Sequence, residues 1–259
     1  MDIMELYGLP ALVVFLYMSG VFAAALLIKN NAIVDVAWGL GFICVAFVTL
    51  CLNGRMTPRK GLVTALVLIW GIRLAIHVAL RNGGKPEDFR YAKWRKQWGK
   101  WFVPRSYLQI YLLQGILLLI ISSPLILVNR SQSTGMTLLD IIGVFIWCLG
   151  FFFESVSDYQ LVRFKGNPAH KGLIMTRGLW KFSRHPNYFG EALLWWGVFI
   201  IALSVEYGWI AIVSPLLITF LLLRVSGVTM LEKKYAGNKE YAAYAQKTSA
   251  FVPWIPKSN

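Results

Sequence analysis

Residues 61–80 read GLVTALVLIWGIRLAIHVAL, an apolar run that is interrupted by only three polar side chains, Thr64, Arg73 and His77. A helix rises 1.5 Å per residue, and roughly 20 mostly apolar residues cross the hydrocarbon core of a bilayer. The stretch therefore predicts a membrane-spanning helix that carries two ionisable side chains inside it.

Six further segments of the same kind lie on either side of this one. No internal repeat, no low-complexity segment and no linker between two soluble domains separates them. The sequence predicts an all-α polytopic membrane protein, with residues 1–259 forming a single integral-membrane domain. The seven predicted spans are 9–28, 35–52, 61–80, 107–128, 137–154, 188–203 and 208–228.

The composition supports this class. Hydrophobic residues make up 57% of the chain and charged residues 15%, whereas soluble domains are about 45–50% apolar and about 25% charged. These values argue against a soluble enzyme, a disordered tail and a nucleic-acid module. The net charge of +14 would suggest nucleic acid in a soluble chain, but basic residues also gather in the cytoplasmic loops of membrane proteins.

The distribution of Lys and Arg predicts the orientation. With seven spans and the N-terminus outside, 20 basic residues fall in the cytoplasmic segments and four in the outer loops, as the positive-inside rule requires. The start of the chain carries Asp2 and Glu5 rather than basic residues, so it does not resemble a cleavable signal. We expect a cytoplasmic C-terminus and three polar cytoplasmic blocks, 81–106, 155–187 and 229–259.

Several ionisable groups lie inside or at the ends of the spans, where charge is costly and usually functional. Asp35 could cap a helix at the interface, Arg73 could pair with a carboxylate, and His77 could be a packed, hydrogen-bonded histidine. Taken together with Glu154 and Glu191, they favour a polar cavity that opens to the cytoplasm.

The stretch GLWKFSRHPNYFGE, residues 178–191, is more specific. Pro186 suits the first turn of a helix, so Arg184 and His185 precede a helix N-terminus, which favours an anion. Asn187 offers both a donor and an acceptor, and Gly190 permits close approach. A structured re-entry turn is the alternative.

Three other segments allow two interpretations each. Loop 81–91, with Lys85, Arg90 and Tyr91, could lie on anionic lipid or contact phosphate. The 154–165 helix end could be solvated, or its Asp158 could contact ribose while Arg163 or Lys165 contacts phosphate. The tyrosines of the C-terminal tail could form an interfacial belt or cover a nucleotide.

These motifs resemble those of a known family. Residues 178–195 around Ser-Arg-His-Pro-Asn-Tyr-Phe-Gly-Glu, the Ser157-Asp158-Tyr159 helix end and the tail from Tyr244 to Pro253 are similar to the steroid 5α-reductase C-terminal region, here about residues 110–259. They most resemble its bacterial branch, domain of unknown function 1295. The resemblance implies NADPH-dependent reduction of a carbon–carbon double bond conjugated to a carbonyl, with the cofactor in the cytoplasmic half of the membrane and a lipid substrate entering laterally.

Matching the motifs places Glu154, Asp158, Lys165, Asn187 and Tyr244 where this family contacts its cofactor. We expect phosphate contacts from Lys85, Arg90, Lys165 and Arg184, because they are cations beside helix ends. The full set of candidate cofactor-binding residues is Lys85, Arg90, Tyr91, Glu154, Asp158, Arg163, Lys165, Arg184, His185, Asn187, Tyr188, Glu191, Tyr241 and Tyr244.

The chain departs from the reductases where the substrate carbonyl is polarised. They use a Gln-Glu pair on the second span and a Tyr on the third, whereas this chain offers Asp35 with Trp38, and Trp70. The candidate catalytic residues are therefore Asp35 as proton donor in a neutral form, assisted by Arg73 or His77.

A second resemblance is to membrane methyltransferases of the isoprenylcysteine carboxyl type, which use S-adenosylmethionine. They share the Arg-His-Pro-x-Tyr-x-Gly pattern, but their Glu-Glu pair is here a single acid, Glu232, followed by Lys233. A non-catalytic lipid-binding or transport protein is the third alternative.

The expected partners are a nucleotide cofactor and a hydrophobic lipid, steroid-like, isoprenoid or fatty acyl, in what we expect to be a bacterial inner membrane. We expect no nucleic acid and no obligate protein partner. The sequence predicts no metal site, because His77, His170 and His185 lack ligand-spaced partners.

Overall fold

The computed structural model describes residues 3–52 and 55–257, and within these residues the regular elements are helices. The predicted all-α class is confirmed. The chain divides into two compact units. The N-terminal unit comprises Met1–Met136 and Ala202–Ala211, and the C-terminal unit comprises Thr137–Ile201 and Ile212–Asn259.

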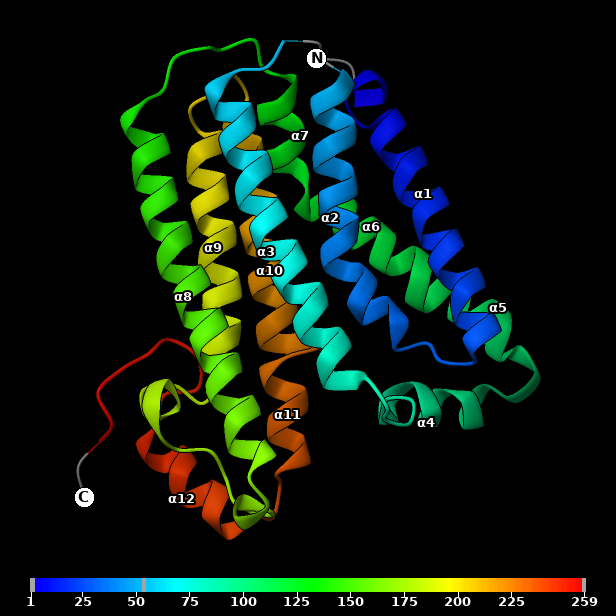
Figure 1. Ribbon diagram of the computed structural model, residues 1–259, viewed down its shortest axis with the longest axis vertical. Coiled ribbons are helices and arrows are strands. Elements are labelled where there is room, and N and C mark those ends of the chain that lie inside the picture. Colours follow the sequence, from blue (N-terminus) through cyan, green and yellow to red (C-terminus); the bar gives the residue numbers. More distant parts are fainter. Residues whose placement is uncertain (1–2, 53–54, 258–259) are drawn as a thin grey trace. The chain divides into compact units, whose positions relative to one another are not determined.

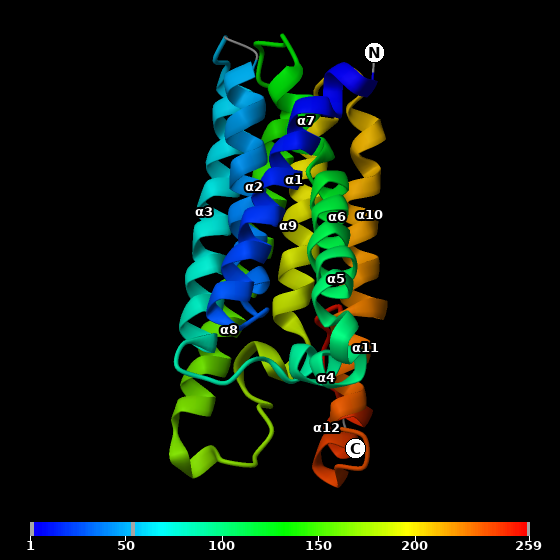
Figure 2. The same ribbon diagram turned by 90° about the vertical axis from the view of Figure 1, so that its right-hand side faces the viewer.

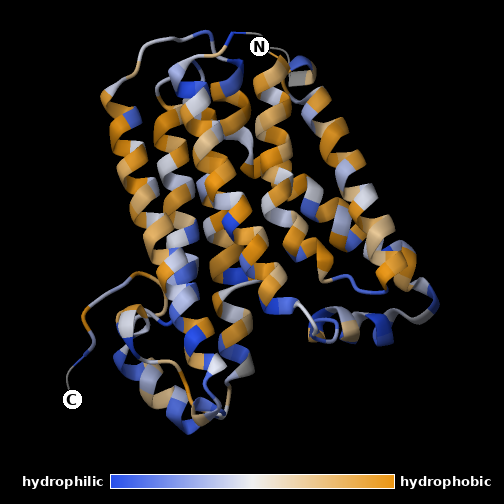
Figure 3. Ribbon diagram, viewed as in Figure 1, coloured by the Kyte–Doolittle hydropathy of each residue, from blue (hydrophilic) through white to orange (hydrophobic). Residues whose placement is uncertain are grey.

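Six helices among the described residues are long and apolar enough to cross a membrane, which is the architecture of an integral membrane protein. Figure 3 shows hydrophobic residues along most of the length of these segments, except at the start of Phe89–Ile121, where residues 89–98 are largely hydrophilic. The predicted span 188–203 is also helical, but its helix α9 (Pro186–Ala202) has 17 residues, about 25 Å. Seven spans therefore remain a prediction. The six helices are Met4–Ile28, Ile33–Leu52, Pro58–Asn82, Phe89–Ile121, Leu138–Gly166 and Gly208–Lys233.

In the N-terminal unit, the helices α1 (Ile3–Ile28), α2 (Ile33–Leu52) and α3 (Pro58–Asn82) run alongside one another. Thr57 caps α3 by accepting a hydrogen bond from the backbone of Lys60, and Pro58 occupies the first turn, where its missing N–H costs nothing. The α2 and α3 backbones touch at two glycines: a Cβ on Gly39 would lie 2.6 Å from the carbonyl oxygen of Gly71. Small residues permit such close approach of membrane helices.

The predicted span 107–128 is not one straight helix. It consists of a π-helical segment η2 (Tyr107–Leu112), α6 (Leu113–Ile121) and α7 (Ser123–Arg130). Pro124 lies in the first turn of α7 and lacks the N–H that would continue the helix from α6, which accounts for the break.

A short crosswise helix, α4 (Phe89–Trp98), connects α3 to this span and lies at the level where α2 begins and α3 ends (Figures 1 and 2). Gly99 ends it with a φ of 50°, a conformation that glycine adopts at little cost. A 3₁₀ turn η1 (Gly99–Trp101) and α5 (Phe102–Ser106) follow.

The C-terminal unit is built on α8 (Leu138–Gly166) and α9, which pack through glycines. Thr137 and Asp140 form a capping box at the start of α8. α8 continues 12 residues beyond the predicted span, so the polar 155–165 stretch is helical, as its spacing predicted. The remaining elements of this unit are η3 (Pro168–His170), η4 (Gly178–Lys181), α10 (Val213–Phe220), η6 (Leu221–Val225), α11 (Val228–Lys234) and α12 (Lys239–Lys247). The 3₁₀ turn η5 (Gly208–Ile212) belongs to the N-terminal unit except for its last residue.

Candidate functional site

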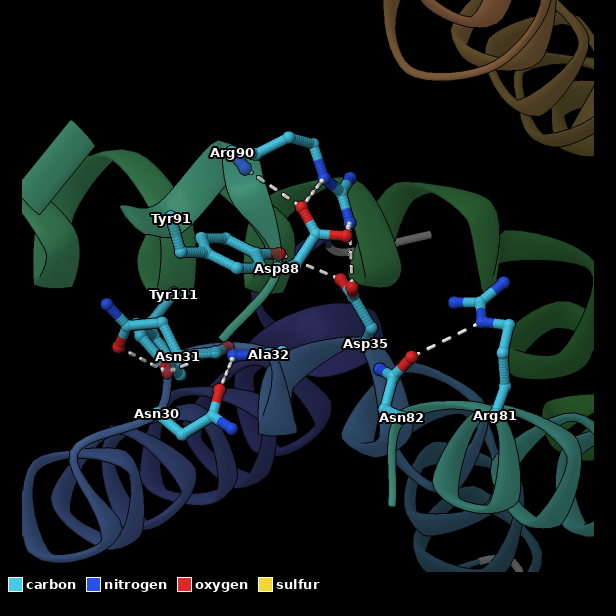
Figure 4. Close-up of polar contacts among 10 residues, drawn as sticks. All are labelled: Asn30, Asn31, Ala32, Asp35, Arg81, Asn82, Asp88, Arg90, Tyr91 and Tyr111. Carbon is cyan, nitrogen blue, oxygen red and sulfur yellow. Dashed lines mark hydrogen bonds and ion pairs between the residues drawn. The ribbon is translucent and has the colours of Figure 1, made fainter. Parts of the chain in front are cut away.

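Asp35 lies in the first turn of α2 and accepts two hydrogen bonds from α4 (Figure 4). Its Oδ2 atom lies 2.8 Å from Nη2 of Arg90, and its Oδ1 atom lies 2.8 Å from the hydroxyl of Tyr91. Tyr91 is buried. Three residues predicted for the site from separate arguments are thus in direct contact.

Asp88 fixes the start of α4 and so places Arg90 and Tyr91. Its Oδ1 atom accepts hydrogen bonds of 2.9 Å from both the backbone N–H and the Nε of Arg90. Burial alone would raise the pKa of the Asp88 carboxyl, but the hydrogen bonds from Arg90 outweigh burial and hold this pKa below its usual value. Asp88 was not among the residues predicted from the sequence, although an Asp before a helix is a recognised N-cap signal.

A second set of contacts extends this network. Glu87 forms an ion pair of 2.9 Å with Arg95 and accepts a hydrogen bond of 2.8 Å from the backbone N–H of Asn31. The Asn31 side chain in turn accepts from the hydroxyl of Tyr111 at 3.0 Å. These contacts were not predicted from the sequence, because the residues that form them are far apart along the chain. Together they fasten α4 to the start of α2.

The other candidates of the N-terminal unit lie on and after α3. Arg73 and His77 are half-buried and one turn apart. Lys85 is exposed, and its ammonium donates to the backbone carbonyl of Arg81. Among the described residues, the Asp35 carboxylate accepts hydrogen bonds from Arg90 and Tyr91, and assistance from Arg73 or His77 stays a prediction.

In the C-terminal unit, two buried carboxylates lie one turn apart near the end of α8. Glu154 is 2% exposed and Asp158 is 7% exposed. The side-chain amide of Asn187, in the first turn of α9, donates to Oδ1 of Asp158 at 3.1 Å. The contact depends on Gly190, because a Cβ there would lie 2.4 Å from the backbone nitrogen of Glu154. Two predicted cofactor residues from different helices are therefore paired.

Arg184 is held by the protein itself. Its Nε and Nη2 atoms lie 2.8 Å and 2.6 Å from Oε1 of Glu232. Its Nη1 atom donates to the backbone carbonyls of Ala245 at 2.7 Å and Thr248 at 2.9 Å. Arg184 thus ties the segment before α9 to α11 and α12, which is a different use of this side chain from the predicted phosphate contact.

His185 is 4% exposed, and its ring stacks on Tyr188 with the ring centroids 5.7 Å apart. Its Nε2 atom lies 3.6 Å from Oε1 of Glu232. Burial has the largest effect and lowers the pKa of His185 from 6.5 to about 4; Glu232 opposes the shift and Arg184 adds to it. The imidazole is therefore neutral at physiological pH.

This shift predicts a pH dependence of stability. Between pH 6.5 and about 4, the unfolded chain binds a proton at His185 that the folded protein does not bind, so stability falls as the pH falls through this window. We expect the His185 contribution to cost about 1–3 kcal/mol on going from pH 7 to pH 4. Thermal unfolding of the wild type and of His185→Gln, followed at several pH values, measures the difference.

Other carboxylates titrate in the same range, so the comparison between variants isolates His185. His170→Gln is the matched control, because His170 is half-buried on η3 and stacks on Phe164. The expectation is wrong if His185→Gln loses as much thermal stability between pH 7 and pH 4 as the wild type does.

The two candidate tyrosines of α12, Tyr241 and Tyr244, contact the segment 180–184 that precedes α9. The Tyr244 hydroxyl donates to the backbone carbonyls of Trp180 and Ser183. Burial raises the pKa of Tyr244, and it raises the pKa of Tyr241 to about 12 with a further contribution from Glu232. Both phenols therefore keep their protons at neutral pH.

The remaining candidates are less enclosed. Arg163 and Lys165 are exposed near the end of α8, and the Arg163 guanidinium lies 5.8 Å from the centroid of the Tyr159 ring. Tyr188 and Glu191 are half-buried on α9.

Two cavities lie in the C-terminal unit. One, of about 360 Å³, is apolar and is lined by Phe153, Leu179, Phe182, Pro253, Trp254 and Ile255. The other, of about 240 Å³, is lined by Phe164, His170, Leu173, Ile174, Thr176, Arg177 and Glu240. The predicted cofactor residues line neither cavity.

Apolar spanning helices with buried polar clusters at their ends define a polytopic helical membrane protein. The profile of the family described as "Protein of unknown function (DUF1295)" matches residues 21–248, and the chain belongs to this family. The chain is similar to an uncharacterised protein of Schizosaccharomyces pombe, with 24% identity over 268 residues, covering 89% of this chain and 75% of that protein. No solved structure matches the chain significantly.

Proposed function

We propose that the protein is a membrane-embedded oxidoreductase that uses NADPH to reduce a carbon–carbon double bond of a hydrophobic lipid. The observation that carries the proposal is the side-chain amide of Asn187. Its nitrogen donates to Asp158, and its Oδ1 atom is buried with no hydrogen-bond partner among the described residues. A buried acceptor without a donor costs about 1–3 kcal/mol, so an amide or hydroxyl group of a nucleotide that displaced the covering residues on binding would supply the missing donor.

The residues around Asn187 offer the hydrogen-bond acceptors and the cations that a nucleotide needs. Asp158 and Glu154 are acceptors suited to ribose hydroxyls and an amide, and Arg163 and Lys165 are exposed cations further along the same helix. NADPH, when bound, supplies a hydride. Asn187 and Asp158 would orient it, and the preference for NADPH over NADH rests on the resemblance to steroid 5α-reductases.

Reduction of a double bond also needs a proton. In the structure Asp35 pairs with Arg90 and accepts a hydrogen bond from the hydroxyl of Tyr91. The group that carries a proton here is therefore the Tyr91 hydroxyl, in place of the neutral Asp35 carboxyl expected from the sequence. In this proposal the Asp35–Tyr91 pair holds the proton, and Arg90 positions the Asp35 carboxylate. The hydrophobic substrate class follows from the membrane-spanning helices, since a lipid would partition to a site among them.

The proposal includes a location. The excess of Lys and Arg in segments 81–106, 155–187 and 229–259 supports a cytoplasmic C-terminus and an outer N-terminus. The bacterial inner membrane is the membrane that the resemblance favours.

One contact favours a second candidate, an S-adenosylmethionine-dependent methyltransferase of the isoprenylcysteine carboxyl type. The resemblance to that class rests on Arg184-His185-Pro186 and on the acid that precedes the tail, Glu232. In the structure Arg184 and Glu232 form an ion pair of 2.6 Å, so these two motifs meet.

Calorimetric titration of the detergent-purified protein with NADPH and, separately, with S-adenosylmethionine tests the proposal. We expect NADPH to bind. We expect Asp158→Asn to weaken this binding at least about tenfold, because the variant keeps the side-chain shape and removes the charge that accepts hydrogen bonds.

Glu240→Gln is the control, because it removes an exposed carboxylate of the same unit. Binding of S-adenosylmethionine in place of NADPH would establish the methyltransferase alternative. Binding of neither, with lipid retained on purification, would favour the non-catalytic lipid-binding protein, for which the apolar cavity of about 360 Å³ is the relevant feature.

A further inference from the structure

The segment from α4 to α5 is strongly basic. Residues 89–106 read FRYAKWRKQWGKWFVPRS and contain six Lys or Arg but no Asp or Glu. Such a composition on a short surface helix is typical of contact with anionic lipid. The structure separates these six cations into two groups.

Two of the cations are used internally. Arg90 pairs with Asp35 and Asp88, and Arg95 pairs with Glu87. The other four are exposed, and none of them forms an ion pair with a residue that the structure describes. They are Lys93, Lys96, Lys100 and Arg105.

Two of the exposed cations share one face of α4, as on an interfacial helix. Lys93 and Lys96 are three residues apart and therefore lie on one side of α4, opposite the buried Tyr91. Trp94 and Trp98 stack with their ring centroids 5.4 Å apart, and Trp101 is 59% exposed. Tryptophan is enriched where a membrane meets water.

The position of α4 points to the same boundary. The bonds from Arg90 and Tyr91 to Asp35 hold α4 against the first turn of α2. α4 lies crosswise at the end of the spanning helices α2 and α3 (Figures 1 and 2), and Figure 3 shows it as a hydrophilic element beside their hydrophobic length. The end of a bundle of spanning helices is where an interfacial helix is expected.

We propose that the four exposed cations of the segment from α4 to α5, which are Lys93 and Lys96 on α4, Lys100 on η1 and Arg105 on α5, bind the headgroups of anionic phospholipids. The charge of these four residues is complementary to the headgroups, and Trp101 supplies the interfacial aromatic ring. Each cation near an anionic membrane surface contributes about fivefold to affinity. The inference uses only the N-terminal unit and does not depend on the proposed reaction.

Native mass spectrometry of the full-length protein in neutral detergent tests this inference, with phosphatidylglycerol or phosphatidylcholine added as the probe. We expect the wild type to retain phosphatidylglycerol in preference to phosphatidylcholine. The variant K93Q/K96Q/K100Q/R105Q should bind phosphatidylglycerol at least about tenfold more weakly, while its helical circular dichroism stays unchanged.

Two further variants make the test specific. K171Q/K181Q/K239Q/K247Q removes four exposed cations of the C-terminal unit and should leave phosphatidylglycerol retention at the wild-type level. K93R/K96R/K100R/R105K keeps every charge and should also retain the lipid. If the first variant does not fold, the charge-preserving variant still tests the proposal. Loss of phosphatidylglycerol by this variant would contradict it, because every positive charge is kept.

Three results would overturn the proposal. Equal retention of the two lipids would mean that the surface recognises only acyl chains. Equal loss in the α4 variant and in the C-terminal control would mean that net charge, not these four residues, attracts the lipid. Displacement of phosphatidylglycerol by excess inorganic phosphate would mean that the cations bind a free anion.

Discussion

Arg184→Ala is expected to lower the free energy of unfolding by about 2–4 kcal/mol, because it leaves a half-buried carboxylate and two carbonyls without their donor. Glu232, Ala245 and Thr248 all lose a bond of less than 3 Å. For a chain of this size the change corresponds to a drop of roughly 10 °C in the unfolding midpoint. Thermal unfolding of the purified protein in detergent, without added nucleotide, measures it.

Two variants define what the result means. Arg177→Ala removes an exposed arginine of the same unit and should change stability by no more than about 0.5 kcal/mol. Arg184→Lys keeps the charge but loses the planar fork that reaches three acceptors, so it should fall between the wild type and Arg184→Ala. If Arg184→Ala unfolds with the wild type yet no longer binds NADPH, then Arg184 is a phosphate ligand and not a structural tie.

Gly190→Ala is expected to destabilise the C-terminal unit by about 3 kcal/mol, the upper part of the usual range for an overpacked interior. The added Cβ would lie 2.4 Å from the backbone nitrogen of Glu154 and 2.5 Å from the carbonyl oxygen of Gly150. Both are main-chain atoms of α8, so no side-chain rotation relieves the clash and the two helices must move apart. The unfolding midpoint in detergent reports the effect.

The displacement should also separate Asn187 from Asp158, so we expect NADPH binding by Gly190→Ala to weaken even below its unfolding temperature. Gly20→Ala is the matched control: it makes the same substitution within α1, where a Cβ meets no atom within 4 Å. Wild-type stability of Gly190→Ala would mean that α8 and α9 do not pack through these glycines in the membrane.

The helical segments could be predicted because hydrophobicity and helix length are local properties. The run 61–80 falls within α3, and Pro186 begins α9 as its position in the first turn predicted. The predicted span 107–128 was less accurate, since it divides at Ser122 and Pro124 into separate helices. A proline in the sequence predicts that a helix breaks or bends there. The direction of the bend depends on how the neighbouring helices pack.

The candidate site was predicted in composition but not in pairing. The sequence selected Asp35, Arg90 and Tyr91, but it could not join them, because about 55 residues and a complete spanning helix separate the acid from its partners. Arg184 was assigned to a phosphate, whereas the structure commits its guanidinium to Glu232 and the tail. The sequence does not show whether a cationic side chain is available to a ligand or is already paired with another residue of the protein.

The sequence by itself determined that this is a helical membrane protein, because apolar segments of about 20 residues have few stable secondary structures in lipid other than the helix. It also determined which ionisable groups lie among those runs. Only the tertiary structure decided which groups neutralise one another and which lack a hydrogen-bond partner within residues 3–52 and 55–257, such as Oδ1 of Asn187. Hydrogen bonds and ion pairs act over a few ångströms between segments that are distant along the chain, so packing has to bring the partners together before their chemistry is defined.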